Sequence, residues 1–125
     1  MITLTQEEKD FIRNDLKSIL KSNNAKKLIY TIKNKPNIRD FIVENNIPIL
    51  QQIKQIPNGM FAYSQLNKIT IPGNVIEIGN YAFNESALSY VVLESGVESI
   101  GSGCFSNCKD LSSIQLPDTL THLGS

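Results

Sequence analysis

The sequence predicts an α+β protein, in which an N-terminal helical cap is followed by a short solenoid of about three coils with a small parallel sheet. Apolar residues recur at helical spacing through residues 1–56, whereas apolar columns recur every 22–23 residues through residues 57–125. Pro57-Asn58-Gly59 separates the two patterns and ends helical structure. We therefore expect two domains, a helical capping domain at 1–56 and a repeat domain at 57–125.

The first expected helix begins at a capping box, Thr5-Gln6-Glu7-Glu8, in which Thr5 is the N-cap and Glu8 reaches back to its amide. An apolar stripe follows at i, i+4, i+7 and i+8, made of Ile12, Leu16, Ile19 and Leu20. Ser22-Asn23-Asn24 ends this helix and can cap a second one. The stripe of that second helix consists of Leu28, Ile29 and Ile32.

Two further helices are expected before the repeats. Pro36 fits the first turn of a third helix, where its missing N–H costs nothing, and Asn45-Asn46 ends that helix. Its buried candidates are Ile38, Phe41 and Ile42. Pro48 can open a fourth short helix, whose inward residues are Ile49, Leu50, Ile53 and Ile56.

The second part of the chain is periodic, and this is the strongest pattern in the sequence. Six apolar columns recur in three copies, namely Phe61, Phe83 and Phe105; Leu66, Leu88 and Leu111; Ile69, Val91 and Ile114; Ile71, Leu93 and Leu116; Val75, Val97 and Leu120; Ile78, Ile100 and Leu123. A period in the twenties is typical of leucine-rich repeats. One coil buries too little surface to stand alone, so we expect the coils to stack and share a core.

Each coil can be divided into a strand, a return leg and a turn. Ile69 and Ile71 alternate as the inward residues of a strand, and the return leg buries Val75 and Ile78. A turn that carries the phenylalanine closes the coil. Glycine recurs where each coil turns back, which indicates either a positive φ or a close approach of another chain segment; the glycines are Gly79, Gly101 and Gly124.

Two segments carry a resemblance to a known family. Gly79-Asn80-Tyr81-Ala82-Phe83 and Leu111-Ser112-Ser113-Ile114-Gln115-Leu116-Pro117 resemble the BspA-like class of leucine-rich repeats, over residues 57–125. In that class, a coil runs from an Ala-Phe turn through a Leu-x-x-Ile-x-Ile-Pro strand to a Val-x-x-Ile-Gly return. Glu94 departs from the pattern, because it stands where the proline would be, and the turn before Phe61 lacks the Gly and Ala. The resemblance implies a protein-binding module.

No residue pattern indicates catalysis, a cofactor or a metal. Cys104 and Cys108 share columns with Ala82 and Ser86, so we expect two packed thiols rather than a redox pair. A structural zinc site needs about four ligands, and His122 is the only histidine in the sequence. We expect His122 on the surface, since no base and orienting acid accompany it. The sequence therefore predicts a non-enzyme that needs no cofactor.

Outward positions of the three strands are the candidate partner-binding site. They are Lys68, Thr70, Tyr90, Val92, Ser113 and Gln115, which alternate with core residues and are expected on the concave sheet face. Tyr90 and Val92 stand at the centre, and tyrosine is enriched at interface hot spots. The alternative interpretation is that these two are incidental surface residues, which are common.

Charge is divided unevenly along the chain. Residues 1–56 hold ten Lys/Arg against six Asp/Glu, a net +4, and residues 57–125 hold two against six, a net −4. The basic part contains a run of lysines, but one interleaved tyrosine and few arginines argue against nucleic acid as the direct ligand; the run consists of Lys17, Lys21, Lys26, Lys27, Lys33 and Lys35. The charges indicate either two solvated surfaces or an acidic half that meets a basic partner.

Two functions follow from these observations. The first is a non-catalytic protein–protein interaction module that binds another protein through its sheet face or its helical cap. The alternative is a small inhibitor from a phage or mobile element, which blocks a basic nucleic-acid-handling effector such as a nuclease. Charged residues stand where a signal peptide would be apolar, and no apolar run approaches the roughly 20 residues of a membrane span, so we expect a cytoplasmic protein without membrane contact.

The last coil is expected to expose an apolar stacking edge, because no further repeat follows it in this sequence. Its edge residues are Phe105, Ile114, Leu116, Leu120 and Leu123. Three occupants are open: a second copy in a homodimer, a partner protein, or further coils of a longer array. We expect the homodimer, since a packed edge then needs no other component.

Overall fold

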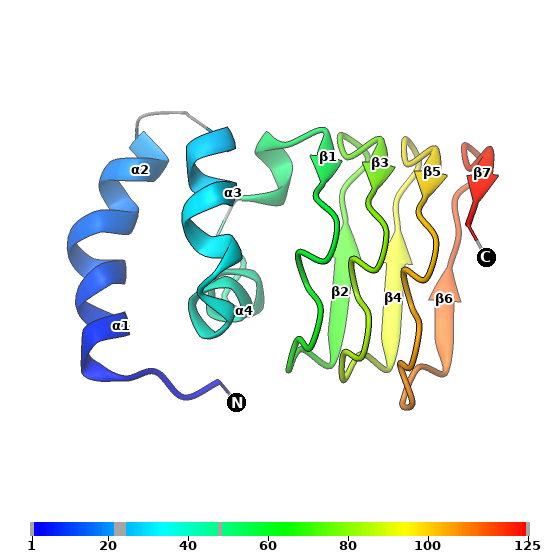
Figure 1. Cartoon of the computed structure of the whole chain (residues 1–125). Coiled ribbons are helices and arrows are strands. Elements are labelled where there is room, and N and C mark those ends of the chain that lie inside the picture. Colours follow the sequence, from blue (N-terminus) through cyan, green and yellow to red (C-terminus); the bar gives the residue numbers. More distant parts are fainter. Residues whose placement is uncertain (1, 22–24, 48, 125) are drawn as a thin grey trace. The chain divides into compact units, whose positions relative to one another are not determined.

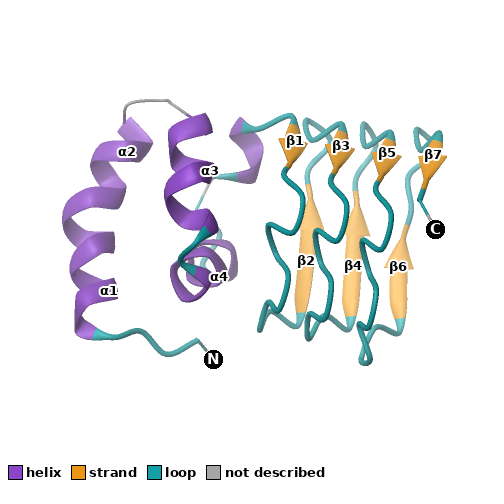
Figure 2. Ribbon diagram, in the orientation of Figure 1, coloured by secondary structure: helices purple, strands orange, loops and turns teal. Residues whose placement is uncertain are grey.

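The computed structural model describes residues 2–21, 25–47 and 49–124 (Figures 1 and 2). By its internal contacts the chain forms two compact units, Met1–Ile49 and Leu50–Ser125. The first unit is helical and the second is a solenoid of parallel strands. This confirms the predicted class of fold, helices followed by about three repeat coils.

The first helix of the helical unit follows the predicted pattern. It comprises α1 (Gln6–Phe11), the π-helical turn η1 (Ile12–Leu16) and α2 (Lys17–Lys21). The capping box is present, since the Glu8 amide donates to Thr5 Oγ1 at 3.1 Å and the Thr5 amide donates to Glu8 Oε1 at 2.8 Å. These two bonds satisfy amides that the first turn of a helix otherwise leaves without partners.

Two more helices complete this unit, α3 (Ala25–Lys33) and α4 (Pro36–Glu44). Pro36 lies in the first turn of α4, as predicted. Buried aliphatic side chains come from all three helices, and they are Leu16, Ile29, Ile32, Ile38 and Ile42. Arg39 and Asp40 are also buried and form an ion pair of 3.0 Å between Arg39 Nε and Asp40 Oδ1. The predicted stop at Ser22-Asn23-Asn24 and the role of Pro48 lie outside the described residues.

The prediction of a fourth helix is wrong. Residues after Ile49 instead form a single 3-10 turn, η2 (Leu50–Gln52), and a short strand, β1 (Gln55–Ile56). The side chains expected to point inward are nevertheless buried, because a coil and a helix can both bury residues spaced three apart. Residues 50–56 therefore form the first half-coil of the solenoid unit, one step before the predicted repeats.

The solenoid unit contains two parallel sheets on different sides of each coil (Figure 1). Strands β2 (Lys68–Ile71), β4 (Tyr90–Leu93) and β6 (Ser113–Gln115) form one sheet. The other sheet consists of β1, β3 (Glu77–Ile78), β5 (Ser99–Ile100) and β7 (His122–Leu123), each paired with the next in that order. The predicted small parallel sheet is the first of these, and the return legs add the second.

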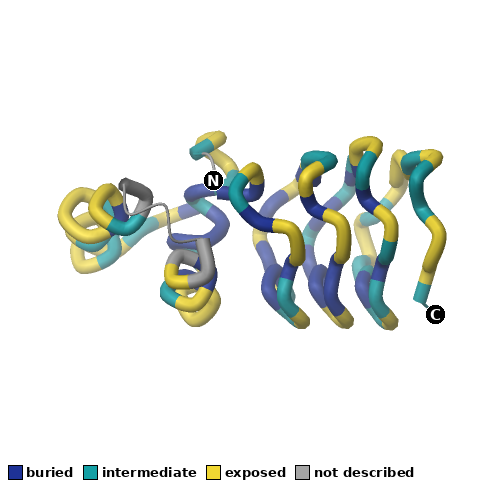
Figure 3. Tube along the Cα trace, turned by 90° about the horizontal axis from the view of Figure 1, so that it is seen from above, coloured by how far each residue is buried: buried dark blue, intermediate teal, exposed yellow. Residues whose placement is uncertain are grey.

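The strand registers confirm the apolar columns. Ile69 pairs with Val91 and Val91 with Ile114, while on the return legs Ile78 pairs with Ile100. In the earlier coils the side chains of these columns are buried, whereas Ile114 in the last coil is exposed. Figure 3 shows buried residues alternating with exposed ones along the coils. The phenylalanines of the turns stack inside, with ring centroids 5.4 Å apart for Phe61 and Phe83 and 5.4 Å for Phe83 and Phe105. In-register stacking thus builds one continuous core.

Close approach, and not a positive φ, explains the recurring glycine of the return leg. A Cβ on Gly79 would lie 2.6 Å from the amide nitrogen of Asn58, and a Cβ on Gly101 would lie 2.5 Å from that of Asn80. Neither glycine has a positive φ. The Asn58 side chain accepts the Asn80 amide at 2.8 Å, so a polar ladder passes just where the glycine leaves room.

Candidate functional site

The structure brings all six predicted partner-binding residues onto one face of the β2–β4–β6 sheet. Register pairs Lys68 with Tyr90 and Tyr90 with Ser113 in one row. Thr70 pairs with Val92 and Val92 with Gln115 in the second row. We name this surface, made of Lys68, Thr70, Tyr90, Val92, Ser113 and Gln115, the sheet face. Two rows two residues apart on each strand necessarily share one side of the sheet.

The sheet face is mostly polar at its margins and apolar at its centre. Tyr90 is 42% exposed and Val92 is half-buried, while the four flanking side chains are exposed. On the opposite side of the same strands, Ile69 and Val91 are buried in the core. Because the inward residues hold the strands in register, the outward side chains are presented at fixed spacing. Such a surface can bind a partner by contact, with one lysine as its only charge.

A hydroxyl ladder fixes the start of these strands. Ser89 Oγ donates to the carbonyl oxygen of Asn67 at 3.1 Å, and Ser112 Oγ donates to that of Ser89 at 3.1 Å. The three residues precede β2, β4 and β6 directly. Side-chain bonds of this kind satisfy carbonyls between coils and limit slippage of the register. These bonds therefore help to hold β2, β4 and β6 in register where the strands begin.

Both cysteines are free thiols, and Cys104 is buried while Cys108 is half-buried. Burial raises the pKa of the Cys104 thiol from 9.0 to about 12. Cys108 Sγ donates to the carbonyl oxygen of Phe83 at 3.0 Å and lies 3.3 Å from Ser86 Oγ. A reactive thiol needs a lowered pKa and access, so the burial and raised pKa of Cys104 argue against a role as nucleophile.

Among the residues that the structure describes, His122 belongs to no cluster of metal-ligating side chains. His122 is exposed, and its Nδ1 lies 3.1 Å from Thr121 Oγ1. Within residues 2–21, 25–47 and 49–124, no group of three His, Cys, Asp or Glu side chains is placed to hold a metal ion. Across the same described part of the chain, every helix is too short or too polar to cross a bilayer.

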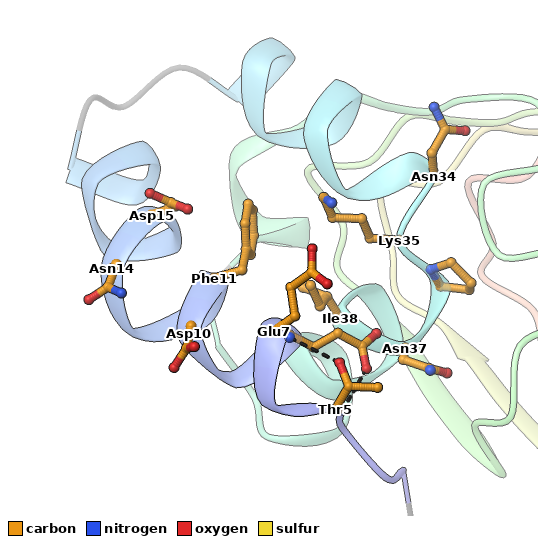
Figure 4. A pocket seen from close by; sticks show the side chains of 12 residues that line it. Thr5, Glu7, Asp10, Phe11, Asn14, Asp15, Asn34, Lys35, Asn37 and Ile38 are labelled. Atoms are coloured by element: carbon orange, nitrogen blue, oxygen red, sulfur yellow. Dashed lines mark hydrogen bonds between the residues drawn. The ribbon is translucent and has the colours of Figure 1, made fainter.

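The helical unit contains an open cleft of about 650 Å³ near the start of α1 (Figure 4). Carboxylates dominate its charged lining, which comprises Glu7, Glu8, Asp10 and Asp15 against Lys35. The Lys35 Nζ lies 5.2 Å from the centroid of the Phe11 ring, so the ring of Phe11 already makes a cation–π contact with Lys35. Glu8 is engaged in the capping box. The ring of Phe11, the amine of Lys35 and the carboxylate of Glu8 thus already contact other groups of the helical unit, and we assign no ligand to this cleft.

Two exposed tyrosines on the turns were missed by the sequence reasoning. Tyr63 is 67% exposed and Tyr81 is 54% exposed, and both adopt a positive φ. The sequence does contain a sign of the unusual backbone at Tyr81, because Tyr81 stands in the same repeat column as Gly59 and Gly103. The half-coil at 50–56 was also missed, although Ile53-x-x-Ile56 repeats the spacing of Val75-x-x-Ile78.

Comparison with known proteins gives one match. A family model described as "BspA type Leucine rich repeat region (6 copies)" matches residues 30–125. The match begins upstream of residue 57, where the sequence resemblance began, and it includes the half-coil that carries β1. No curated protein and no solved structure matches the chain.

Proposed function

Because the chain belongs to the BspA-type leucine-rich-repeat family, we propose that it is a non-catalytic module that binds another protein through the sheet face. The observation that carries the proposal is the in-register pair of rows centred on Tyr90 and Val92, both on β4. Tyrosine at the centre of a rigid surface loses little entropy when a partner covers it. The polar rim of Lys68, Thr70, Ser113 and Gln115 matches the usual anatomy of an interface.

The test is capture of the partner with the tagged chain from the native host, followed by mass spectrometry and calorimetry on the purified pair. Tyr90→Ala is expected to weaken binding by about 1–3 kcal/mol while leaving Tm nearly unchanged. Tyr30→Ala is the matched control, because Tyr30 is 78% exposed in α3 and lies outside the sheet face. Equal affinities for wild type and Tyr90→Ala would place the interface elsewhere.

A second candidate function is favoured by the charge of the solenoid unit. Residues 50–125 hold three lysines and six carboxylates, a net −3. All six carboxylates are exposed, namely Glu77, Glu85, Glu94, Glu98, Asp110 and Asp118. Such a surface attracts a basic partner and accelerates its association. The corresponding proposal is a small inhibitor, of phage or mobile-element origin, that acts in the cytoplasm on a basic nucleic-acid-handling effector such as a nuclease.

Nuclease assays separate this candidate from a general binding module. Host and phage nucleases with basic active-site surfaces would be assayed with and without the purified chain at several salt concentrations. Inhibition that weakens as salt increases supports the inhibitor. Unchanged cleavage, together with a captured partner of another class, contradicts it and leaves the binding module.

The last coil supports a further proposal, a homodimer formed through its stacking edge. Ile114 is 37%, Leu116 48% and Leu123 66% exposed, whereas the same columns in earlier coils are buried. The outer edges of β6 and β7 pair with no other strand of the described chain. An exposed apolar edge with free backbone groups favours association with a second copy.

A further inference from the structure

Each turn of the solenoid contains two backbone positions, four residues apart, with φ in the left-handed region. The first position holds Gly59, Tyr81 and Gly103, at φ of 66°, 56° and 62°. The second position holds Tyr63, Glu85 and Asn107, at φ of 62°, 54° and 59°. We name residues 59–63, 81–85 and 103–107 the turn edge. Backbone bonds such as Tyr63 N–H to Asn84 O at 2.8 Å stack these turns directly on one another.

Glycine and asparagine are the residues that this geometry favours, because other side chains crowd the backbone at positive φ. Gly59, Gly103 and Asn107 follow the preference, whereas Glu85 and the two tyrosines, Tyr63 and Tyr81, do not. Burial gives no compensation, since these rings are 67% and 54% exposed. The chain therefore presents two aromatic rings to solvent at positions where its own fold favours smaller residues. A conformational cost that the fold does not require points to a role in binding.

The ring of Tyr81 is held in place by the next turn. A Cβ added at Gly103 would collide with Tyr81 Cε1 and would lie 2.6 Å from Cδ1, so the ring lies against the backbone of that glycine. Its other side remains open, as its exposure shows. A ring that is already fixed loses little freedom when a ligand stacks on it.

Charge around the rings selects the ligand. The turn segments 57–64, 79–86 and 101–108 contain no Lys or Arg, so the tyrosines have no cation of their own turns to stack on. Glu85 follows Tyr81 by four residues in the same turn and shares the column of Tyr63. Aromatic rings beside a carboxylate are the surroundings that a guanidinium group prefers, since it stacks on the rings and pairs with the carboxylate.

We propose that the turn edge, through Tyr63, Tyr81 and Glu85, binds arginine side chains of a partner protein. This surface is separate from the sheet face, because the turn residues lie outside β2, β4 and β6 in every coil. The solenoid unit then has two contact surfaces, of which the turn edge recognises positive charge.

The experiment is a titration of the ¹⁵N-labelled full chain, followed by NMR, with an acetylated Arg-Gly-Arg-Gly-Arg peptide and with its Lys-Gly-Lys-Gly-Lys counterpart. The arginine peptide is expected to shift the amides of the turn edge and to bind more tightly than the lysine peptide. The double variant Tyr63→Gly/Tyr81→Gly is expected to weaken arginine-peptide binding about tenfold. Its Tm should not fall, because glycine suits both backbone positions.

Two control variants separate the proposal from general attraction to negative charge. Glu85→Gln is expected to weaken binding, whereas Glu94→Gln, an exposed carboxylate outside the turn edge, is not. Tyr30→Ala should bind as wild type does. Equal losses in the two glutamine variants, equal binding of both peptides, or no binding at all would overturn the proposal. Shifts confined to the sheet face would overturn it too, and would leave the proposed binding module intact.

Discussion

The rings of Phe61 and Phe83 lie 5.4 Å apart between centroids, with their planes 7° from parallel. Phe105 continues the same stack on the far side of Phe83, at 5.4 Å and 4°. Each ring closes one turn, so the stack joins three coils through a single column of the sequence. Phe83 has a ring on both sides, whereas in the described chain Phe105 has one on a single side and is half-buried.

This difference predicts unequal losses of stability. Phe83→Ala is expected to lower the free energy of unfolding by about 3–5 kcal/mol, and Phe105→Ala by about 1–3 kcal/mol. Urea denaturation of the full chain measures both, with Phe83→Leu as a milder variant if Phe83→Ala does not fold. Equal losses of unfolding free energy at the two positions would contradict the idea that stacking on both sides of Phe83 adds to stability.

Gly103 and Gly59 form a matched pair for the contact with Tyr81. Both have positive φ, but a Cβ on Gly59 has nothing within 4 Å, while a Cβ on Gly103 collides with the Tyr81 ring. Gly59→Ala is expected to cost about 1 kcal/mol and Gly103→Ala about 2–3 kcal/mol. The excess should vanish in a Tyr81→Gly background, which a double-mutant cycle measures. An unchanged excess would mean that the ring lies elsewhere.

Cys104 should be unreactive and should make stability depend on pH. With a pKa of about 12, only about one Cys104 thiol in ten thousand is ionised near pH 8. A maleimide should therefore label Cys108 before Cys104 in the folded protein, and both in urea. The Cys104 thiol ionises at pH 9.0 when exposed and only at about 12 when folded, so its contribution to stability holds below pH 9 and falls as pH rises further. Cys104→Ala should lessen that decline between about pH 9 and pH 12; identical pH profiles would contradict the shift.

Self-association through the stacking edge is tested by sedimentation. The wild type is expected to become dimeric as concentration rises into the high micromolar range, and Leu123→Glu to remain monomeric, because a charge replaces an apolar edge residue. His122→Glu adds the same charge to the outward side of the same strand and serves as control. A wild type that is monomeric throughout would leave a partner protein or further coils as the occupant of the edge.

Truncation tests the predicted capping role of the helices and the predicted domain boundary. Fragment 57–125 is expected to be insoluble or molten, because it lacks the helices and also β1, which pairs with β3. Fragment 50–125 keeps β1 and the carbonyls of Leu50 and Ile53 that accept from Asn74 Nδ2 at 2.8 and 2.7 Å. It should be the more stable of the two. A soluble and cooperatively folding 57–125 fragment would contradict both the cap and the importance of the half-coil.

The sequence by itself determined the repeat class, the coil registers and the content of the sheet face. Each column is a set of apolar residues that must be buried one above another, so the spacing alone predicts that Ile69, Val91 and Ile114 are neighbours. The outward residues follow from the alternation of side chains along a strand, which by itself predicts that Tyr90 and Val92 lie on the same face of the sheet. The capping box at Thr5 is equally local, because its two hydrogen bonds join residues three apart.

Only the tertiary structure decided features that depend on neighbouring coils. Ile53 and Ile56 are spaced for either a helix or a coil, and the pairing of β1 with β3 decides for the coil. The left-handed backbone of Tyr63 and Tyr81 arises because each turn follows the path of the turns stacked on it, and tyrosine itself gives no sign of that geometry. Exposure at these two rings is likewise a property of the assembled coils, which is why the turn edge is visible only once the chain is folded.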